Sequence, residues 1–257
     1  MVIRDIILLV IIVNVNDVNV NYIDYGNKNG KAIVLLHGWG QNIEMMKPIG
    51  DKLQKENRII IVDLPGHGKS EEPPFAWTVY DYVAMLKNFL TKLSIEKPIL
   101  VGHSFGGKLS LLYASMWEVE KLVVFGSPFT KEIKKDSLKL KILKSLKKIP
   151  GISKLEGVAK KHIGSTDYRN ASPVMRQILV ETVNCGIEDK VININCPTLI
   201  IWGDLDEAVS IDRAYELEKL IKDSAVIVYE GCTHYAYLEN LGKTISILRN
   251  FIGGSNE

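Results

Sequence analysis

The sequence predicts an α/β domain: a doubly wound, mostly parallel sheet with an inserted helical cap. Short runs rich in Val, Ile and Leu alternate along the chain with longer stretches of helical periodicity. Continuous apolar runs of this kind are typical of parallel strands covered on both faces, and their alternation with helices implies right-handed crossovers. A chain of 257 residues with 46% hydrophobic content can also bury one large core.

Six buried strands and five helices are predicted in chain order. The strands are AIVLLHG (32–38), RIIIVDLPG (58–66), PILVGHS (98–104), KLVVFGSP (121–128), PTLIIWGD (197–204) and AVIVYEG (225–231). The helices cover about 43–56, 77–93, 105–117, 210–222 and 236–252. In such folds ligands bind beyond the carboxyl ends of the strands, so we expect the site in the loops that follow them.

The N-terminal segment is predicted to form edge strands. Ile6 to Val13 is an apolar, β-branched run, and VNVNYIDYG (18–26) alternates in the manner of a strand. An export signal is the alternative for the first run. We favour a strand because Asp5 abuts the run and eight residues are too few to span a bilayer.

One stretch interrupts the alternation of strands and helices. Between Ser127 and Asn195 we find helical patterns and two breaks, but no convincing strand. A structureless loop of that length is improbable in a compact domain, so we expect about three helices over the strand ends. The predicted division is a core formed by 1–128 and 196–257, with a helical cap at 129–195.

Bulk composition excludes several classes of function. A formal net charge of +2 gives no sign of nucleic-acid binding. The three cysteines are odd in number and match no zinc or CxxC spacing, so we expect no metal and a reduced, cytoplasmic setting. GHGKS (66–70) ends like a phosphate-binding loop. However, Asp63 stands where that loop needs glycine, and Pro73 and Pro74 prevent the required helix, so we expect neither nucleotide nor cofactor.

The stretch GHSFGG (102–107) predicts an exposed nucleophile. Ser104 lies between a predicted strand and a predicted helix, where a sharp turn strains the backbone and leaves no room for neighbouring side chains. Gly102, Gly106 and Gly107 remove those side chains. The turn would raise the Ser104 hydroxyl above the sheet, at the positive end of the following helix.

A general base and an acid can be assigned to later loops. Of the five histidines, His234 alone follows the last strand at the catalytic edge, so we assign it as the base. Asp204 and Asp206 both follow the strand TLIIWG. We favour Asp206, which lies deeper in the loop, and assign Asp204 to the turn.

In order and spacing these motifs resemble the α/β-hydrolase superfamily along nearly the whole chain. The matching stretches are LLHGWG (35–40), DLPGHGKS (63–70), VGHSFGGK (101–108), WGDLDEAV (202–209) and GCTHYAYLE (231–239). The resemblance implies a Ser104–Asp206–His234 catalytic triad. It also implies an oxyanion hole formed by the backbone N–H groups of Trp39 and Phe105. Four further residues of these motifs are expected beside the substrate: His37, Gly38, His103 and Tyr235.

The triad favours hydrolysis of a small carboxylic ester or thioester through an acyl-enzyme. HGWG resembles the methyl-ester carboxylesterases of biotin synthesis. Two alternatives stay open: a hydrolase that cleaves carbon–carbon bonds in ring-fission products, and a non-enzymatic ligand receptor. The first commonly carries Trp after the catalytic histidine, where this chain has Tyr235. The sequence does not identify the acyl or alcohol group.

A basic stretch lies within the predicted cap. Eleven lysines and three acidic residues occur from Lys131 to Lys161. A solvated helix face is the simpler interpretation. The alternative is that these lysines attract an acidic partner, an anionic surface or a negatively charged ester.

Overall fold

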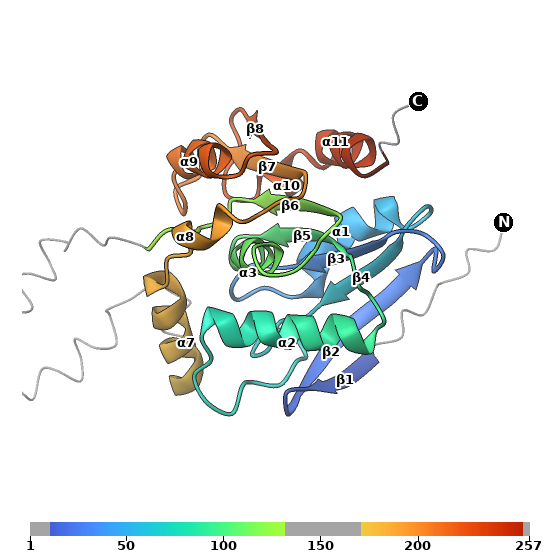
Figure 1. Cartoon of the computed structure of the whole chain (residues 1–257), viewed down its shortest axis with the longest axis vertical. Coiled ribbons are helices and arrows are strands. Elements are labelled where there is room, and N and C mark those ends of the chain that lie inside the picture. Colours follow the sequence, from blue (N-terminus) through green and yellow to red (C-terminus); the bar gives the residue numbers. More distant parts are fainter. Residues whose placement is uncertain (1–10, 132–170, 254–257) are drawn as a thin grey trace, which may run out of the picture.

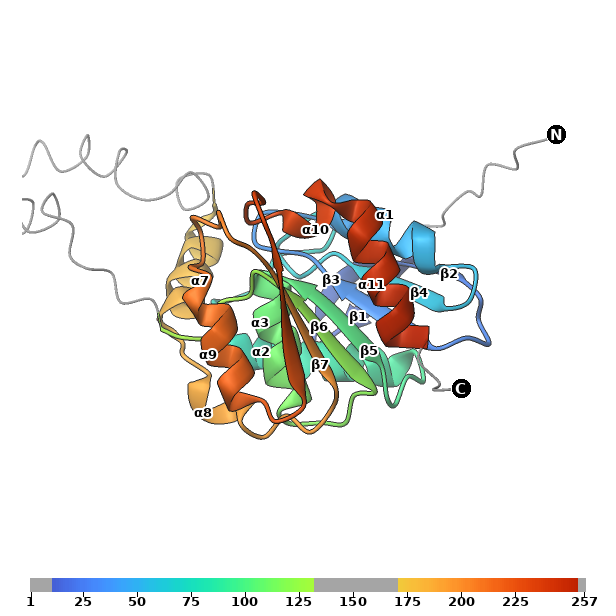
Figure 2. The same cartoon turned by 90° about the horizontal axis from the view of Figure 1, so that it is seen from above.

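The computed structural model describes residues 11–131 and 171–253, which form one eight-stranded sheet with helices on both faces (Figures 1 and 2). The strand order is β1-β2-β4-β3-β5-β6-β7-β8. The strands are β1 Ile11–Val15, β2 Val18–Gly26, β3 Ala32–Leu36, β4 Arg58–Val62, β5 Ile99–His103, β6 Lys121–Phe125, β7 Thr198–Gly203 and β8 Ser224–Tyr229. Strands β3 to β8 pair in parallel, whereas β1 and β2 pair antiparallel. The predicted doubly wound, mostly parallel sheet is therefore confirmed.

Two groups of helices cover the two faces of the sheet. They are α1 Ile43–Leu53, α2 Val79–Lys92, α3 Phe105–Ala114, α7 Pro173–Asn184, α8 Glu188–Val191, α9 Asp212–Leu220, α10 Ala236–Glu239 and α11 Leu241–Gly253. Helices α1, α10 and α11 cover one face, and α2, α3 and α9 cover the other (Figure 2). Successive side chains of a strand point to opposite faces of the sheet, so each strand contributes to both hydrophobic cores. In β3, Val34 and Leu36 belong to one core, and Ile33 and Leu35 belong to the other. No helix in these two ranges is long and apolar enough to cross a membrane.

The N-terminal hairpin explains why β1 and β2 pair antiparallel. Asn16 and Asp17 both have positive φ, 51° and 62°, which is the backbone of a tight two-residue turn between β1 and β2. The predicted strand at Ile6 to Val13 is only partly covered, because the described chain starts at Ile11. The observed strand extends to Val15.

One helix prediction was wrong in detail. The segment 236–252 is not a single helix but two, α10 and α11, which meet at Asn240. Asn240 has φ −125° and ψ 55°, outside the helical region, so the chain changes direction there. The apolar pattern of the sequence does not reveal this break, because α10 and α11 bury their apolar residues against the same face of the sheet.

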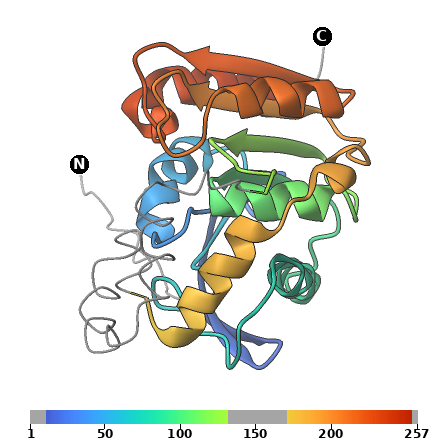
Figure 3. The same cartoon turned by 90° about the vertical axis from the view of Figure 1, so that its left-hand side faces the viewer.

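The region predicted as a cap is partly described. Residues 127–131 and 171–195 contain α7 and α8 and no strand. The two ends of the region meet, since the Ile187 N–H donates to the Phe129 carbonyl at 2.8 Å. Figure 3 shows α7 in the foreground, beside the helices of the sheet. The lysine-rich stretch lies outside the described residues apart from Lys131, so its division into a separate cap and its proposed acidic partner stay predictions.

Candidate active site

Ser104 occupies the strained turn that the sequence predicted. It lies between β5 and α3 with φ 51° and ψ −113°, a backbone conformation that a non-glycine residue rarely adopts. Its N–H donates to the Phe125 carbonyl at 2.9 Å, and its carbonyl accepts the first helical bond from Lys108 at 2.9 Å. The turn is therefore fixed from the sheet on one side and from the helix on the other.

Close packing explains the glycines around this serine. A Cβ on Gly102 would lie 2.6 Å from the Gly106 carbonyl oxygen, and a Cβ on Gly106 would lie 2.3 Å from the Leu36 carbonyl oxygen. Both contacts are with backbone, which cannot move aside. The motif is thus required to bring strand and helix together at the turn.

His234 and Asp206 form a partly buried pair at the same edge of the sheet. His234 Nδ1 lies 2.7 Å from Asp206 Oδ2, and the Asp206 side chain is fully buried. Asp206 Oδ1 accepts the N–H groups of Ala208 and Val209 at 2.8 and 2.9 Å. Because an ionised carboxylate only accepts, Nδ1 carries the proton of the neutral ring, and Nε2 is left with a free lone pair.

Asp204 is placed differently from Asp206. It is exposed, and its N–H donates to the Tyr229 carbonyl at 3.2 Å, which joins the loop to the end of β8. The contact with His234 is made by Asp206, which sequence analysis favoured. Two N–H groups of the same loop, from Ala208 and Val209, donate to that carboxylate, as burial of a polar group requires.

Ser104 and His234 line a common cavity of about 170 Å³. The other lining residues are Trp39, Phe105, Lys108, Pro128, Thr130, Leu179, Thr182, Val183, Ala208 and Val209. Phe105 is the first residue of α3, so its N–H has no carbonyl partner within the helix. Trp39 follows β3 in a loop at the same edge. The two predicted oxyanion donors therefore belong to residues that border the nucleophile.

The four residues expected beside substrate do not line this cavity. The His103 ring is fully buried, and its Nε2 donates to the His234 carbonyl oxygen at 3.0 Å. Side chains alternate along a strand, so the residue before Ser104 is directed behind the site. Burial and, to a smaller extent, the nearby His234 lower the pKa of His103 to about 3. It contacts the loop that carries His234, and its placement beside substrate stays a prediction.

The remaining three residues, His37, Gly38 and Tyr235, form hydrogen bonds with neighbouring loop residues. His37 Nε2 accepts the Leu64 N–H at 3.0 Å while Nδ1 donates to the Gly38 carbonyl at 2.7 Å, and burial lowers the pKa of His37 to about 3. The Gly38 N–H donates to Gln41 at 3.1 Å. Tyr235 is 38% exposed, and its hydroxyl accepts from Gln41 Nε2 at 3.1 Å. These contacts hold the loops next to the motifs, and the placement of the three residues beside substrate stays a prediction.

Sequence analysis missed Gly126 at the end of β6. Its φ is 50°, and a Cβ there would lie 2.9 Å from His234 Nδ1 and 3.1 Å from Asp206 Oδ2. The missing side chain makes room for the His–Asp pair. The only signal in the sequence is a small residue at the end of the strand that neighbours the Ser104 strand.

Lys108 was also missed. Its side chain is buried, lines the cavity, and Nζ donates to the carbonyls of Thr182, at 2.7 Å, and Cys185. Those carbonyls belong to the last turn of α7 and the residue after it, where helices leave carbonyls unpaired. Lys108 therefore ties the helix of the nucleophile to α7, which forms one wall of the cavity.

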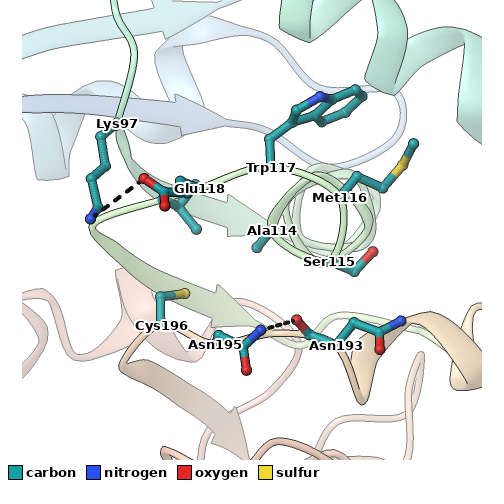
Figure 4. Close-up of a pocket in the computed structure, with 10 residues that line it drawn as sticks. Lys97, Ala114, Ser115, Met116, Trp117, Glu118, Asn193, Asn195 and Cys196 are labelled. Carbon is teal, nitrogen blue, oxygen red and sulfur yellow. Dashed lines mark hydrogen bonds and ion pairs between the residues drawn. The ribbon is translucent and has the colours of Figure 1, made fainter.

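A second hollow lies at the opposite edge of the sheet (Figure 4). It has a volume of about 320 Å³ and adjoins the amino ends of β5, β6 and β7. Lys97 Nζ lies 3.8 Å from Glu118 Oε2, and Asn195 Nδ2 donates to the Asn193 carbonyl at 2.9 Å. No cluster of His, Cys, Asp and Glu suited to a metal ion occurs in residues 11–131 and 171–253.

Comparison with known proteins identifies the family. The family model described as the alpha/beta hydrolase fold matches residues 31–137 and 130–241. The chain therefore belongs to the α/β hydrolase family, and it is a hydrolase of that fold. The resemblance drawn from the sequence motifs is confirmed.

Individual relatives differ in the reactions that their names state. The AB hydrolase superfamily protein YisY of Bacillus subtilis is 30% identical over 87% of this chain and 92% of its own. A pimeloyl-[acyl-carrier protein] methyl ester esterase of Aliivibrio fischeri is 26% identical, over 87% and 94%. A 2-hydroxy-6-oxononadienedioate/2-hydroxy-6-oxononatrienedioate hydrolase of Pseudomonas putida is 27% identical, over 87% and 88%.

A solved structure agrees with the fold. The enol-lactonase of Burkholderia xenovorans superposes with a TM-score of 0.76 at 19% identity, covering 95% of this chain and all of the other. At that identity the likeness shows the shared architecture of sheet and helices.

Proposed function

We propose that this protein hydrolyses a small carboxylic ester or thioester through a covalent acyl-enzyme on Ser104. The observation that carries the proposal is that a serine in a strained turn shares a cavity with a histidine whose Nδ1 is held by a buried carboxylate. A nucleophile, a base and a group that orients the base are the parts that acyl transfer requires.

The reaction proceeds by two acyl transfers. Ser104 Oγ attacks the ester carbonyl carbon while His234 Nε2 takes the hydroxyl proton, and Asp206 stabilises the imidazolium that forms. The negative tetrahedral oxygen is stabilised by the N–H groups of Trp39 and Phe105. His234 then protonates the leaving alcohol or thiol, and the acyl group remains on Ser104. Water repeats the sequence, which releases the carboxylic acid and restores the serine.

The size and lining of the cavity support a small, largely apolar acyl group. Its volume of about 170 Å³ is below the roughly 300–1,000 Å³ of drug-sized ligand pockets. Apolar side chains of Leu179, Val183 and Val209 form much of the lining. The ester name of one relative supports the same class of substrate.

A hydrolysis screen tests the proposal against its alternatives. We expect turnover of p-nitrophenyl esters with a preference for short acyl chains, because long chains exceed the cavity. Preferential cleavage of a vinylogous 1,5-diketone would instead establish the carbon–carbon hydrolase, whose relative matches this chain about as well. Binding of esters without turnover would indicate a receptor.

A further inference from the structure

Gln41 forms two hydrogen bonds with the loop that carries the first proposed oxyanion donor. Its backbone N–H donates to the Gly38 carbonyl at 3.2 Å, and its side-chain Oε1 accepts the Gly38 N–H at 3.1 Å. Gln41 therefore holds both peptide groups that flank Gly38. The second of these groups is the peptide between Gly38 and Trp39, whose N–H is the proposed donor.

Peptide planarity links the direction of that donor to these bonds. The peptide is trans, so its C=O and N–H point in opposite directions, and the Gly38 carbonyl sets the direction of the Trp39 N–H. The Gly38 carbonyl accepts from His37 Nδ1 at 2.7 Å as well as from Gln41. The preceding carbonyl, of His37, accepts the Gly106 N–H at 3.0 Å. The donor is thus fixed relative to α3, the helix that begins after the nucleophile.

The side chain of Gln41 also contacts the loop of the base. Its Nε2 donates at 3.1 Å to the hydroxyl of Tyr235, the residue after His234. The His103 ring lies against the same amide, with Nδ1 3.3 Å from Gln41 Oε1, while its Nε2 donates to the His234 carbonyl at 3.0 Å. Because Nε2 carries the proton, the Nδ1 contact is packing rather than a hydrogen bond. Gln41 therefore joins the loop of the oxyanion donor to the loop of the base.

Close packing limits the movement of the Gln41 amide. A Cβ on Gly38 would lie 3.0 Å from His103 Nδ1 and 3.2 Å from Gln41 Cδ, so both side chains press against the glycine. The amide oxygen and the amide nitrogen each have a partner, so rotation of the amide would break both bonds. A donor held by such a group is aimed before the reaction begins, which is the condition for stabilising a developing oxyanion.

We propose that Gln41 is a positioning residue that directs the Trp39 N–H toward the reacting oxygen and keeps it in register with His234. The proposal rests on the proposed function, because the direction of the donor matters only when a tetrahedral oxyanion forms. Among the described residues, those that line the catalytic cavity do not include Gln41, so it acts through Trp39 and not on the substrate.

The test compares two inhibitors with the same alkyl chain, a methyl ketone and a trifluoromethyl ketone. With the trifluoromethyl ketone, Ser104 Oγ bonds to the carbonyl carbon, the C=O π electrons move to the oxygen, and the hydroxyl proton moves to His234 Nε2. The adduct therefore carries the oxyanion of the tetrahedral intermediate, whereas the methyl ketone binds mainly as a carbonyl. The ratio of the two inhibition constants measures oxyanion stabilisation, and any loss of folded protein cancels in it.

Gln41→Met keeps a side chain of similar length without the amide. We expect the preference for the trifluoromethyl ketone to fall by about tenfold, since a misdirected donor costs less than the 10²- to 10³-fold that follows the loss of a donor. The kcat/KM for p-nitrophenyl acetate should fall by about the same factor. Gln54→Met is the matched control: Gln54 is also half-buried, and its Nε2 donates to the Asp51 carbonyl at 3.1 Å, near the other end of α1. It should keep the preference within about twofold.

Tyr235→Phe separates the two halves of the network. It removes the bond to the base loop and leaves the bonds to Gly38, so the preference should fall by about threefold. In the double variant the preference should equal that of Gln41→Met alone, because that change already removes the bond to Tyr235. Losses that multiply would overturn the role of Gln41 as the link between the two loops.

Two outcomes distinguish this proposal from the proposed function. Equal binding of both ketones by the unmodified protein would contradict the acyl-enzyme mechanism and the proposal together. A strong preference in the unmodified protein that persists in Gln41→Met would contradict the positioning role alone.

A measurement without any inhibitor completes the test. In a ¹⁵N–¹H spectrum the Trp39 amide resonance should broaden or split in Gln41→Met, because its peptide group can then take several directions. It should stay single in Gln54→Met. A single, unmoved Trp39 resonance in Gln41→Met would overturn the proposal.

Discussion

The hollow at the amino ends of the strands is larger than the catalytic cavity at the carboxyl ends, but its lining residues in the described part of the chain form no reactive arrangement. The hollow at the amino ends of β5 to β7 has about 320 Å³ and is lined by Lys97, Asn193, Cys196 and neighbours (Figure 4). The cavity at the carboxyl ends has about 170 Å³. Size therefore does not identify the site, and the chemistry of the lining does.

The chemical difference lies in strain and pairing. At the carboxyl edge Ser104 is held at positive φ, and Asp206 uses both oxygens to accept hydrogen bonds. At the amino edge burial raises the pKa of the Cys196 thiol, so this cysteine is a weak nucleophile. The carboxyl edge has the features of an active site, because a strained backbone there holds polar side chains close to one another.

The largest effect is expected from the nucleophile and base. Ser104→Ala and His234→Ala should each lower kcat for p-nitrophenyl acetate by about 10⁴-fold or more, because neither group works without the other. The double variant should be no slower than either single variant, and circular dichroism should show an intact fold. If the kcat losses of the two single variants multiplied in the double variant, the two residues would act in separate steps.

Replacing the carboxylate comes next. Asp206→Asn should lower kcat by about 10³- to 10⁴-fold, because an amide can leave His234 in the wrong tautomer. Asp204→Asn is the matched control from the same loop, and it should stay within about twofold. A larger loss from Asp204 than from Asp206 would reverse the assignment.

A methyl group at Gly126 should have a smaller effect. Gly126→Ala introduces a Cβ that must displace His234 Nδ1 or Asp206 Oδ2, both about 3 Å away. We expect kcat to fall by about 10- to 100-fold, since small displacements of reacting groups are costly. An unchanged kcat would show that the pair tolerates movement.

Stability should depend on pH through the buried histidines behind the site. His37 and His103 have pKa values lowered to about 3 by burial, against about 6.5 in the unfolded chain. Between these values the unfolded state binds more protons, so the free energy of unfolding falls as pH drops below about 6.5. Each group contributes a loss of about 2 kcal/mol by pH 5. Urea titrations of His103→Gln should give a shallower fall, and an unchanged slope would contradict it.

The smallest effect is expected at the amino edge. Lys97→Gln removes the charge that faces Glu118 in the second cavity, and both side chains are largely exposed. Ester turnover should change by less than about twofold, because surface ion pairs contribute little. A loss of tenfold or more would assign this cavity a part in the reaction.

The sequence predicts where the candidate site lies better than it predicts the side-chain contacts within the site. The strand ends, the turn at Ser104 and the choice of Asp206 follow from short-range patterns that a single chain displays. The placement of His103 does not, because a histidine beside the nucleophile can face the substrate or the loop behind it. Gly126 and Lys108 act through contacts with residues between 74 and 108 positions away, at Thr182, Asp206 and His234. Such long-range contacts have no periodicity to reveal them.

The most direct test of the account is covalent labelling of the unmodified protein with a fluorophosphonate, followed by mapping of the labelled peptide. Attack on phosphorus needs an activated serine next to a base, so we predict a single adduct on Ser104. Labelling should be slowed strongly in His234→Ala and little in Lys97→Gln. An adduct on another residue, or ester turnover that persists after Ser104 is fully labelled, would contradict the account.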